Sequence, residues 1–153
     1  EVLHRAPAKA IVFVPFSEAL RKVRDFVNAE LKKKAKDFFA ELVNGSVGSS
    51  ERSRIFAAFQ RDPNCRVLVA DAGCMSHGLT LTESNLIVWF GVEVSNRTYT
   101  QANGRITRPG QKRHQHVIHF SGTPVETKLY RRLQTRRSTQ GALLEFVKEG
   151  ILK

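Results

Sequence analysis

Residues 10–31 have the sequence AIVFVPFSEALRKVRDFVNAEL, in which a short apolar run precedes a segment with helical periodicity. The apolar run, residues 10–14, is rich in β-branched side chains and predicts a buried strand. Ser17 is a candidate N-terminal cap for the helix that follows. The apolar positions of that helix recur at helical spacing: Leu20, Val23, Val27 and Leu31. The stretch therefore predicts a strand that leads into a helix.

The rest of the chain continues this alternation of apolar strands and helical segments. Further strands are expected at residues 38–43, 67–70, 86–90 and 116–120. A second helix is expected after Ser49 or Ser50, with Ile55, Phe56 and Phe59 on its inner face. Further helices are expected over residues 96–107 and 142–152, and one more begins at the capping sequence Thr123-Pro124-Val125-Glu126. Apolar strands separated by helices predict an α/β fold, with a mostly parallel sheet of about five to six strands and helices on both faces.

Functional residues in parallel sheets gather at the carboxyl ends of the strands. The loops after Ala70, Phe90 and Phe120 are therefore the expected positions of a site. The 153 residues are 41% hydrophobic and show no evident linker, which indicates one domain over residues 1–153. Within it we expect an entry segment at 1–8 and a C-terminal helix at 138–153.

Composition narrows the class of protein. No apolar run is long enough to cross a bilayer, and the first ten residues lack a signal-peptide pattern, so we expect a location inside a cell. Cys65 and Cys74 have no paired spacing, which favours two buried or loop thiols over a disulfide or a zinc site. Lys and Arg total 25 against 14 acidic residues, a net charge of +11 that indicates polyanionic partners. On charge alone, a basic protein without a nucleic-acid role stays an open alternative.

The segment QANGRITRPGQ, residues 101–111, carries the strongest chemical signal. If the helix continues through it, Gln101, Arg105 and Arg108 project from one face. Guanidinium groups are permanently charged and forked, which suits them to phosphate and makes them poor general bases. The alternative is a solvated basic helix that makes surface ion pairs.

Five segments together resemble the C-terminal RecA-like lobe of Swi/Snf-type superfamily two DNA helicases and translocases. The segment QANGRITRPGQKR is similar to the sixth motif of that family, QAxxRxxRxGQ, and residues 67–90 are similar to the fifth. KAIVFVPF resembles the fourth motif, NGSVGSSERSRIFAAF the segment after it, and Gly122-Thr123 with Glu126 the GTxxE helix start. The matches occur in the family's order and cover residues 9–133. GLTLT resembles annealing helicases and compact prokaryotic or viral members, which favours a bacterial or phage cytoplasm, or a nucleus if the source is eukaryotic.

The resemblance implies a role for each matching residue. Arg108 resembles the arginine finger that reaches the γ-phosphate of ATP on the first lobe, with Arg105 and Gly78 also on the nucleotide side. Gln101 is similar to the glutamine that orients these groups. Gly78 and Thr80 resemble residues that approach the DNA backbone and the lobe interface. Arg52 resembles a contact to the tracking strand, although a helix-surface charge is an equally good interpretation.

Some residues depart from the family or invite other interpretations. Asp71 stands where many relatives have Ser or Thr, and its carboxylate would repel a phosphate, so it is not expected to contact DNA. Tyr99 is a candidate for an exposed stacking contact, whereas Trp89 lies in an apolar strand and is expected in the core. His114, His116 and His119 form a cluster with no further ligand at a suitable spacing, so no metal site is predicted.

The chain has neither a GxxxxGK[ST] loop nor an Asp-Glu pair after a strand. ATP and Mg²⁺ are therefore expected to be held mainly by an N-terminal RecA-like lobe of the same polypeptide, and this chain alone is expected to be inactive. Duplex DNA is the expected partner, because Lys112-Arg113 after RPGQ favours the DNA family. The alternatives are the C-terminal lobe of an RNA helicase and a non-enzymatic basic nucleic-acid-binding module.

Overall fold

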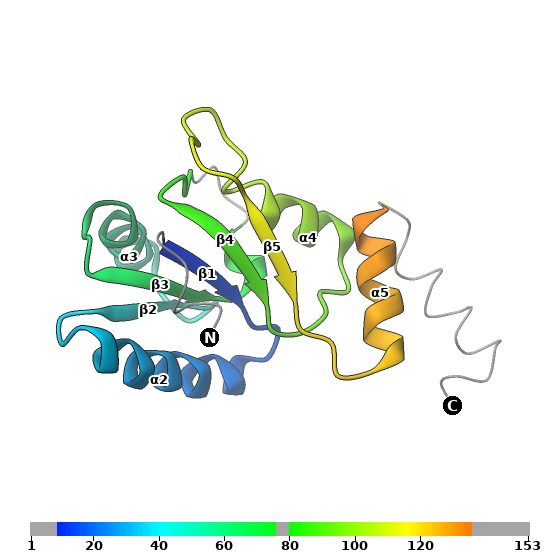
Figure 1. The fold of residues 1–153 in the computed structure, drawn as a ribbon, viewed down its shortest axis with the longest axis horizontal. Helices are drawn as coiled ribbons and strands as arrows, with labels where there is room; N and C mark the ends of the chain where they lie inside the picture. Colours follow the sequence, from blue (N-terminus) through cyan, green and yellow to red (C-terminus); the bar gives the residue numbers. More distant parts are fainter. Residues whose placement is uncertain (1–8, 76–79, 136–153) are drawn as a thin grey trace.

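The computed structural model describes residues 9–75 and 80–135, which contain one five-stranded parallel sheet (Figure 1). Its strands are β1 (Lys9–Phe13), β2 (Phe39–Val43), β3 (Cys65–Ala70), β4 (Ser84–Trp89) and β5 (His116–His119). Their order across the sheet is β2-β3-β1-β4-β5, and every pairing is parallel. The predicted parallel α/β sheet is confirmed.

Helices cover both faces of the sheet. One face is covered by α2 (Ser17–Lys34), whose Leu20, Val27 and Leu31 are buried against alternate residues of the strands. The other face is covered by α3 (Ser49–Arg61), a short 3₁₀ helix η1 (Ala72–Met75), α4 (Asn96–Asn103) and α5 (Pro124–Gln134). Because the central strands β1, β3 and β4 are buried on both sides, their sequences are mostly apolar rather than alternating, whereas the edge strands β2 and β5 are less buried. No helix in residues 9–75 and 80–135 is long and apolar enough to cross a bilayer.

The sequence predicted the N-terminal cap of one helix correctly and the caps of two other helices incorrectly. Thr123 caps α5 as predicted: its hydroxyl accepts from Glu126 N–H at 3.2 Å, and the Glu126 carboxylate accepts from Thr123 N–H at 3.0 Å. Ser17 and Ser49 do not cap their helices, because Phe16 and Gly48 are the last extended residues and make no side-chain cap. The predicted segments at 1–8, 138–153 and 142–152 lie outside the described residues.

Removal of the α5 cap should cost more stability than removal of a serine that does not cap. We expect Thr123→Ala to lower the free energy of unfolding by about 1 kcal/mol, because one first-turn N–H loses its partner. Ser49→Ala is the matched control and should cost less than about 0.5 kcal/mol. Urea titrations of both variants measure the difference, and equal losses would contradict the assignment of the caps.

Candidate functional site

The helix α4 ends before the two arginines of the 101–111 segment. Ser95 begins the helix by accepting from Thr98 N–H at 3.2 Å. At the other end Gly104 N–H donates to the Thr100 carbonyl at 3.0 Å, after which the backbone leaves the helical path. The predicted helix over 96–107 is therefore four residues too long. For this reason the expectation that Gln101, Arg105 and Arg108 project from one helical face is wrong.

The residues RPGQ form a tight turn that presents Arg108. Gln111 N–H donates to the Arg108 carbonyl at 3.1 Å, and Gly110 has a φ of +100°. Proline at the second position and a positive-φ glycine at the third are the signature of a type II β-turn. Pro109 also restricts Arg108 to extended backbone. The turn is therefore rigid, and the Arg108 side chain at its start is exposed.

This arginine turn, residues 105–111, lies against the segment that opens β4. The Arg105 carbonyl accepts from Leu81 N–H at 3.0 Å, and the Gln111 side chain donates to the Ser84 carbonyl at 2.7 Å. Arg113 adds a bond from its guanidinium to the Glu83 carbonyl at 3.0 Å. Ser84 is the first residue of β4, so the turn is fixed at the amino edge of the sheet.

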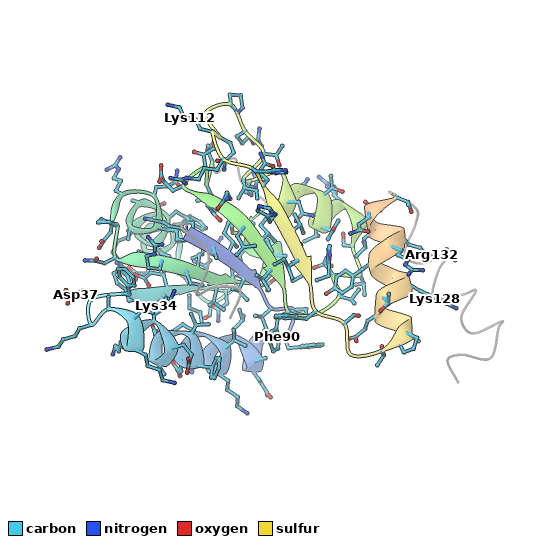
Figure 2. The ribbon with its side chains drawn as sticks, viewed as in Figure 1. Lys34, Asp37, Phe90, Lys112, Lys128 and Arg132 are labelled. Carbon is cyan, nitrogen blue, oxygen red and sulfur yellow. The ribbon has the colours of Figure 1, made fainter. Side chains whose placement is uncertain are left out.

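The arginine turn does not lie at the carboxyl ends of the strands, where the sequence led us to expect functional residues. Figure 2 shows Lys112 in the loop at one end of the sheet and Phe90, just after β4, at the opposite end. The reason is that α4 runs back along the sheet from the end of β4 to the start of β5. The arginine turn lies where this return ends.

Burial and charge distinguish the two arginines. Arg105 is 4% exposed, whereas Arg108 is exposed to solvent. Burial lowers the pKa of Arg105, and the positive charge of Arg108 lowers it further, so the two guanidinium groups lie within electrostatic range of each other. Across residues 9–75 and 80–135 no carboxylate pairs with Arg108. Arg105 and Arg108 therefore influence each other electrostatically although α4 carries neither of them. The Gln101 side chain, half-buried on α4, bonds to neither within those ranges.

Arg52 and Asp71 lie at the opposite, carboxyl edge. Arg52 is in the first turn of α3 and donates to the Val47 carbonyl at 2.9 Å. Its charge also reaches Cys74 of η1, where it offsets part of the rise in the pKa of the thiol caused by burial. The Asp71 carboxylate accepts from Gly73 N–H at 2.9 Å and so holds the turn into η1. This local bond gives Asp71 a structural role.

The fifth motif connects the two edges. It leaves the carboxyl end of β3 through η1 and reaches the amino end of β4 at Leu81. Thr80 is exposed beside this junction, next to the residue that bonds Arg105. Gly78 lies outside the described residues.

Tyr99 is not an exposed stacking residue. It is 6% exposed, its ring packs between Trp89 and His119, and its hydroxyl is 2.9 Å from His119 Nε2. The expectation of exposure is wrong because the ring faces the sheet, where a base cannot reach it. Trp89 is 1% exposed, so its predicted place in the core is confirmed.

The histidine cluster is divided between the two faces of β5. His114 and His116 stack on each other at 5.1 Å between ring centroids, and both are exposed. His119 lies on the other face with Tyr99 and Tyr130. In the described parts of the chain no group of three potential ligands could hold a metal ion. Cys65 and Cys74 are both buried and unpaired, as the sequence predicted.

Sequence reasoning assigned no role to Gln111. Its amide bonds to Thr82 and Ser84, which lie more than 25 residues earlier in the chain. The Pro-Gly pair before it is a readable turn signal, but the partners of the amide are fixed only by the tertiary fold.

Comparisons with known proteins show which family the chain belongs to and which folds it resembles. A family model described as the helicase conserved C-terminal domain matches residues 1–110. The human DNA annealing helicase and endonuclease ZRANB3 is 27% identical over 144 residues, which cover 93% of this chain and 13% of that protein. The chain therefore spans a small part of that relative.

Solved structures share the fold. The C-terminal part of the Fun30 ATPase domain superposes with a TM-score of 0.69 at 19% identity, covering 81% of this chain and 38% of that one. The Sulfolobus solfataricus SWI2/SNF2 ATPase core in complex with dsDNA superposes with a TM-score of 0.59 at 24% identity, covering 84% and 26%. The resemblance to Swi/Snf-type C-terminal lobes that the five motifs predicted is confirmed.

The burial of His119 makes stability depend on pH. Burial lowers its pKa below the usual 6.5, so the folded protein favours the neutral ring. As the pH falls below about 6.5 the unfolded chain takes up a proton that the folded chain resists, and stability is lost. We expect the free energy of unfolding to fall less steeply with acidification in His119→Gln than in the wild type. His114→Gln, at an exposed histidine, is the control; a wild-type pH slope in His119→Gln would contradict the explanation.

Proposed function

Because the chain belongs to the family of helicase conserved C-terminal domains, we propose that it is the second motor lobe of an ATP-dependent Swi/Snf-type DNA translocase or helicase. Its Arg108 is the arginine finger, and the first lobe of the same polypeptide holds most of the ATP and Mg²⁺. The observation that carries this proposal is the arginine turn: an exposed guanidinium on a rigid turn, beside a second, buried one.

The geometry of the turn suits charge stabilisation in phosphoryl transfer. A finger acts by meeting charge that develops on the γ-phosphate, which requires a fixed position and no competing carboxylate. The type II turn supplies the first condition. The absence of an acidic partner for Arg108 within the described ranges supplies the second. Arg105 adds positive potential from the protein side, and its burial ties that charge to the fold.

The opposite edge of the sheet is the proposed DNA side. Arg52 lies there at the start of α3, where first-turn N–H groups favour a phosphate. The net charge of +11 supports a polyanionic partner, and the Sulfolobus SWI2/SNF2 core of similar fold was solved with dsDNA. In this proposal the fifth motif, with Gly78 and Thr80, links the DNA side to the nucleotide side. The alternatives are the C-terminal lobe of an RNA helicase and a non-enzymatic basic nucleic-acid-binding module.

Replacement of Arg108 tests the finger. In the two-lobe protein we expect Arg108→Ala to lower DNA-stimulated ATP hydrolysis by about 10³-fold or more. Arg108→Lys should not restore the rate, because a point charge cannot reproduce the planar fork. Binding of a fluorescent ATP analogue should survive both changes, since the phosphates are held by the other lobe.

The control for Arg108 is Arg131→Ala, at an exposed arginine of α5. This variant also removes one positive charge, but at a position distant in sequence from the arginine turn. It should therefore keep the wild-type rate of ATP hydrolysis. The 153-residue chain without the first lobe should hydrolyse no ATP. If Arg108→Ala hydrolysed ATP at the wild-type rate in the presence of DNA, the assignment of Arg108 as the arginine finger would be wrong. A non-enzymatic basic binding module would then be favoured.

Two arginines of α3 test the DNA side. Arg52 is half-buried at the carboxyl edge, whereas Arg54 is exposed and paired with Glu51 and Glu41. We expect Arg52→Ala to weaken duplex binding equally for two unrelated sequences and to reduce the salt slope by about 1. Arg54→Ala should change both much less. Fluorescence titrations at several salt concentrations measure the slopes, and an equal effect of the two variants would remove Arg52 from the interface.

A further inference from the structure

The side chain of Gln111 bonds the arginine turn to the rest of the domain. Its amide nitrogen lies 2.7 Å from the Ser84 carbonyl, 3.1 Å from that of Thr82 and 3.4 Å from that of Ile106. Its amide oxygen accepts from Arg113 N–H at 3.0 Å. A single amide thus joins both sides of the turn to the segment that opens β4.

The same residue closes the turn that carries Arg108. Gln111 N–H donates to the Arg108 carbonyl at 3.1 Å, with Pro109 and Gly110 between them. The proline ring fixes one backbone angle, and the glycine adopts a φ of +100° that other residues resist. Because the turn itself is stiff, its orientation depends on where Gln111 is anchored. A displaced Gln111 therefore displaces Arg108.

We infer that Gln111 is the positioning residue of the arginine finger; this rests on the proposed function of Arg108. The family resemblance assigned an orienting role to Gln101, yet within the described residues the Gln101 side chain bonds to neither arginine. Gln111 instead fixes the arginine turn to the backbone of Thr82 and Ser84, which lie within the fifth motif. A shift of that segment is consequently transmitted to Arg108 through one side chain.

The test replaces Gln111 with methionine in the two-lobe protein. Methionine has similar length and no amide, so the turn loses the hydrogen bonds of the Gln111 side chain without a change in charge. We expect kcat for DNA-stimulated ATP hydrolysis to fall by about 10²-fold, the effect of displacing a reacting group by about 1 Å. KM for ATP should change little, because the first lobe holds the nucleotide. An unchanged kcat would overturn the inference.

The matched control is Gln60→Met. Gln60 of α3 accepts from Glu83 N–H at 3.3 Å, so it contacts the same segment without touching the arginine turn. Its variant should keep the wild-type kcat, and thermal melting of both variants should be similar. If Gln111→Met melts far below Gln60→Met, Gly110→Ala provides the second probe. The methyl group that alanine adds at position 110 has no atom within 4 Å. The backbone φ of +100° is strained for alanine, however, so the turn is distorted and kcat should fall in this variant too. A normal kcat in Gly110→Ala would then overturn the inference.

Two further measurements separate the positioning role from the finger itself. The double variant Arg108→Ala/Gln111→Met should be no slower than Arg108→Ala, since a positioning residue has nothing left to position. Additive losses would overturn the inference. Hydrogen exchange over a peptide spanning residues 105–114 should be faster in Gln111→Met than in Gln60→Met, and equal exchange would also overturn it. Faster exchange together with full activity of Arg108→Ala would instead show that the anchor exists and that the proposed function has failed.

Discussion

A parallel sheet requires every connection to carry the chain back to the amino edge before the next strand begins. In this domain that requirement determines where the arginine turn lies. The return between β4 and β5 is made by α4, and residues 105–111 occupy the end of that return. The turn can therefore lie only beside the start of β4, where the Arg105 carbonyl and the Gln111 amide find backbone partners. The return between β2 and β3 places the start of α3, with Arg52, at the other edge.

The separation of the two edges suits a motor lobe. A nucleotide contact at one edge and a nucleic-acid contact at the other need a mechanical link, and the fifth motif runs between them. Its residues Leu81, Thr82 and Ser84 are bonded directly to the arginine turn. The burial of Arg105 beside Arg108 adds an electrostatic element, because two nearby positive charges favour the approach of a polyphosphate.

The sequence predicted the sheet well because its central strands, β1, β3 and β4, are buried on both faces. Runs such as residues 10–14 and 67–70 have no polar alternation, and this pattern excludes a half-exposed antiparallel sheet. Helix ends were predicted less well. Ser17 and Ser49 offered good caps, yet the chain becomes helical at the residue after Phe16 and after Gly48. A local preference worth about 1 kcal/mol does not decide a boundary that tertiary packing also constrains.

The sequence named the residues of the candidate site, but the predicted helical arrangement of those residues is wrong. The resemblance selected Arg105 and Arg108, but periodicity placed them on a helix that ends at Asn103. The bond from Leu81 to the Arg105 carbonyl, made across 24 residues, competes with continuation of that helix and has no local signal. Tyr99 was misplaced for a similar reason, since its partner His119 lies 20 residues further on.

The most direct measurement is a structure of the two-lobe protein with duplex DNA and a transition-state analogue of ATP. The proposed function predicts the Arg108 guanidinium at about 3 Å from the position of the γ-phosphate. It also predicts the DNA backbone along the edge of the sheet that carries Arg52. A closed structure in which Arg108 points into solvent, or in which DNA lies along the arginine turn, would contradict it.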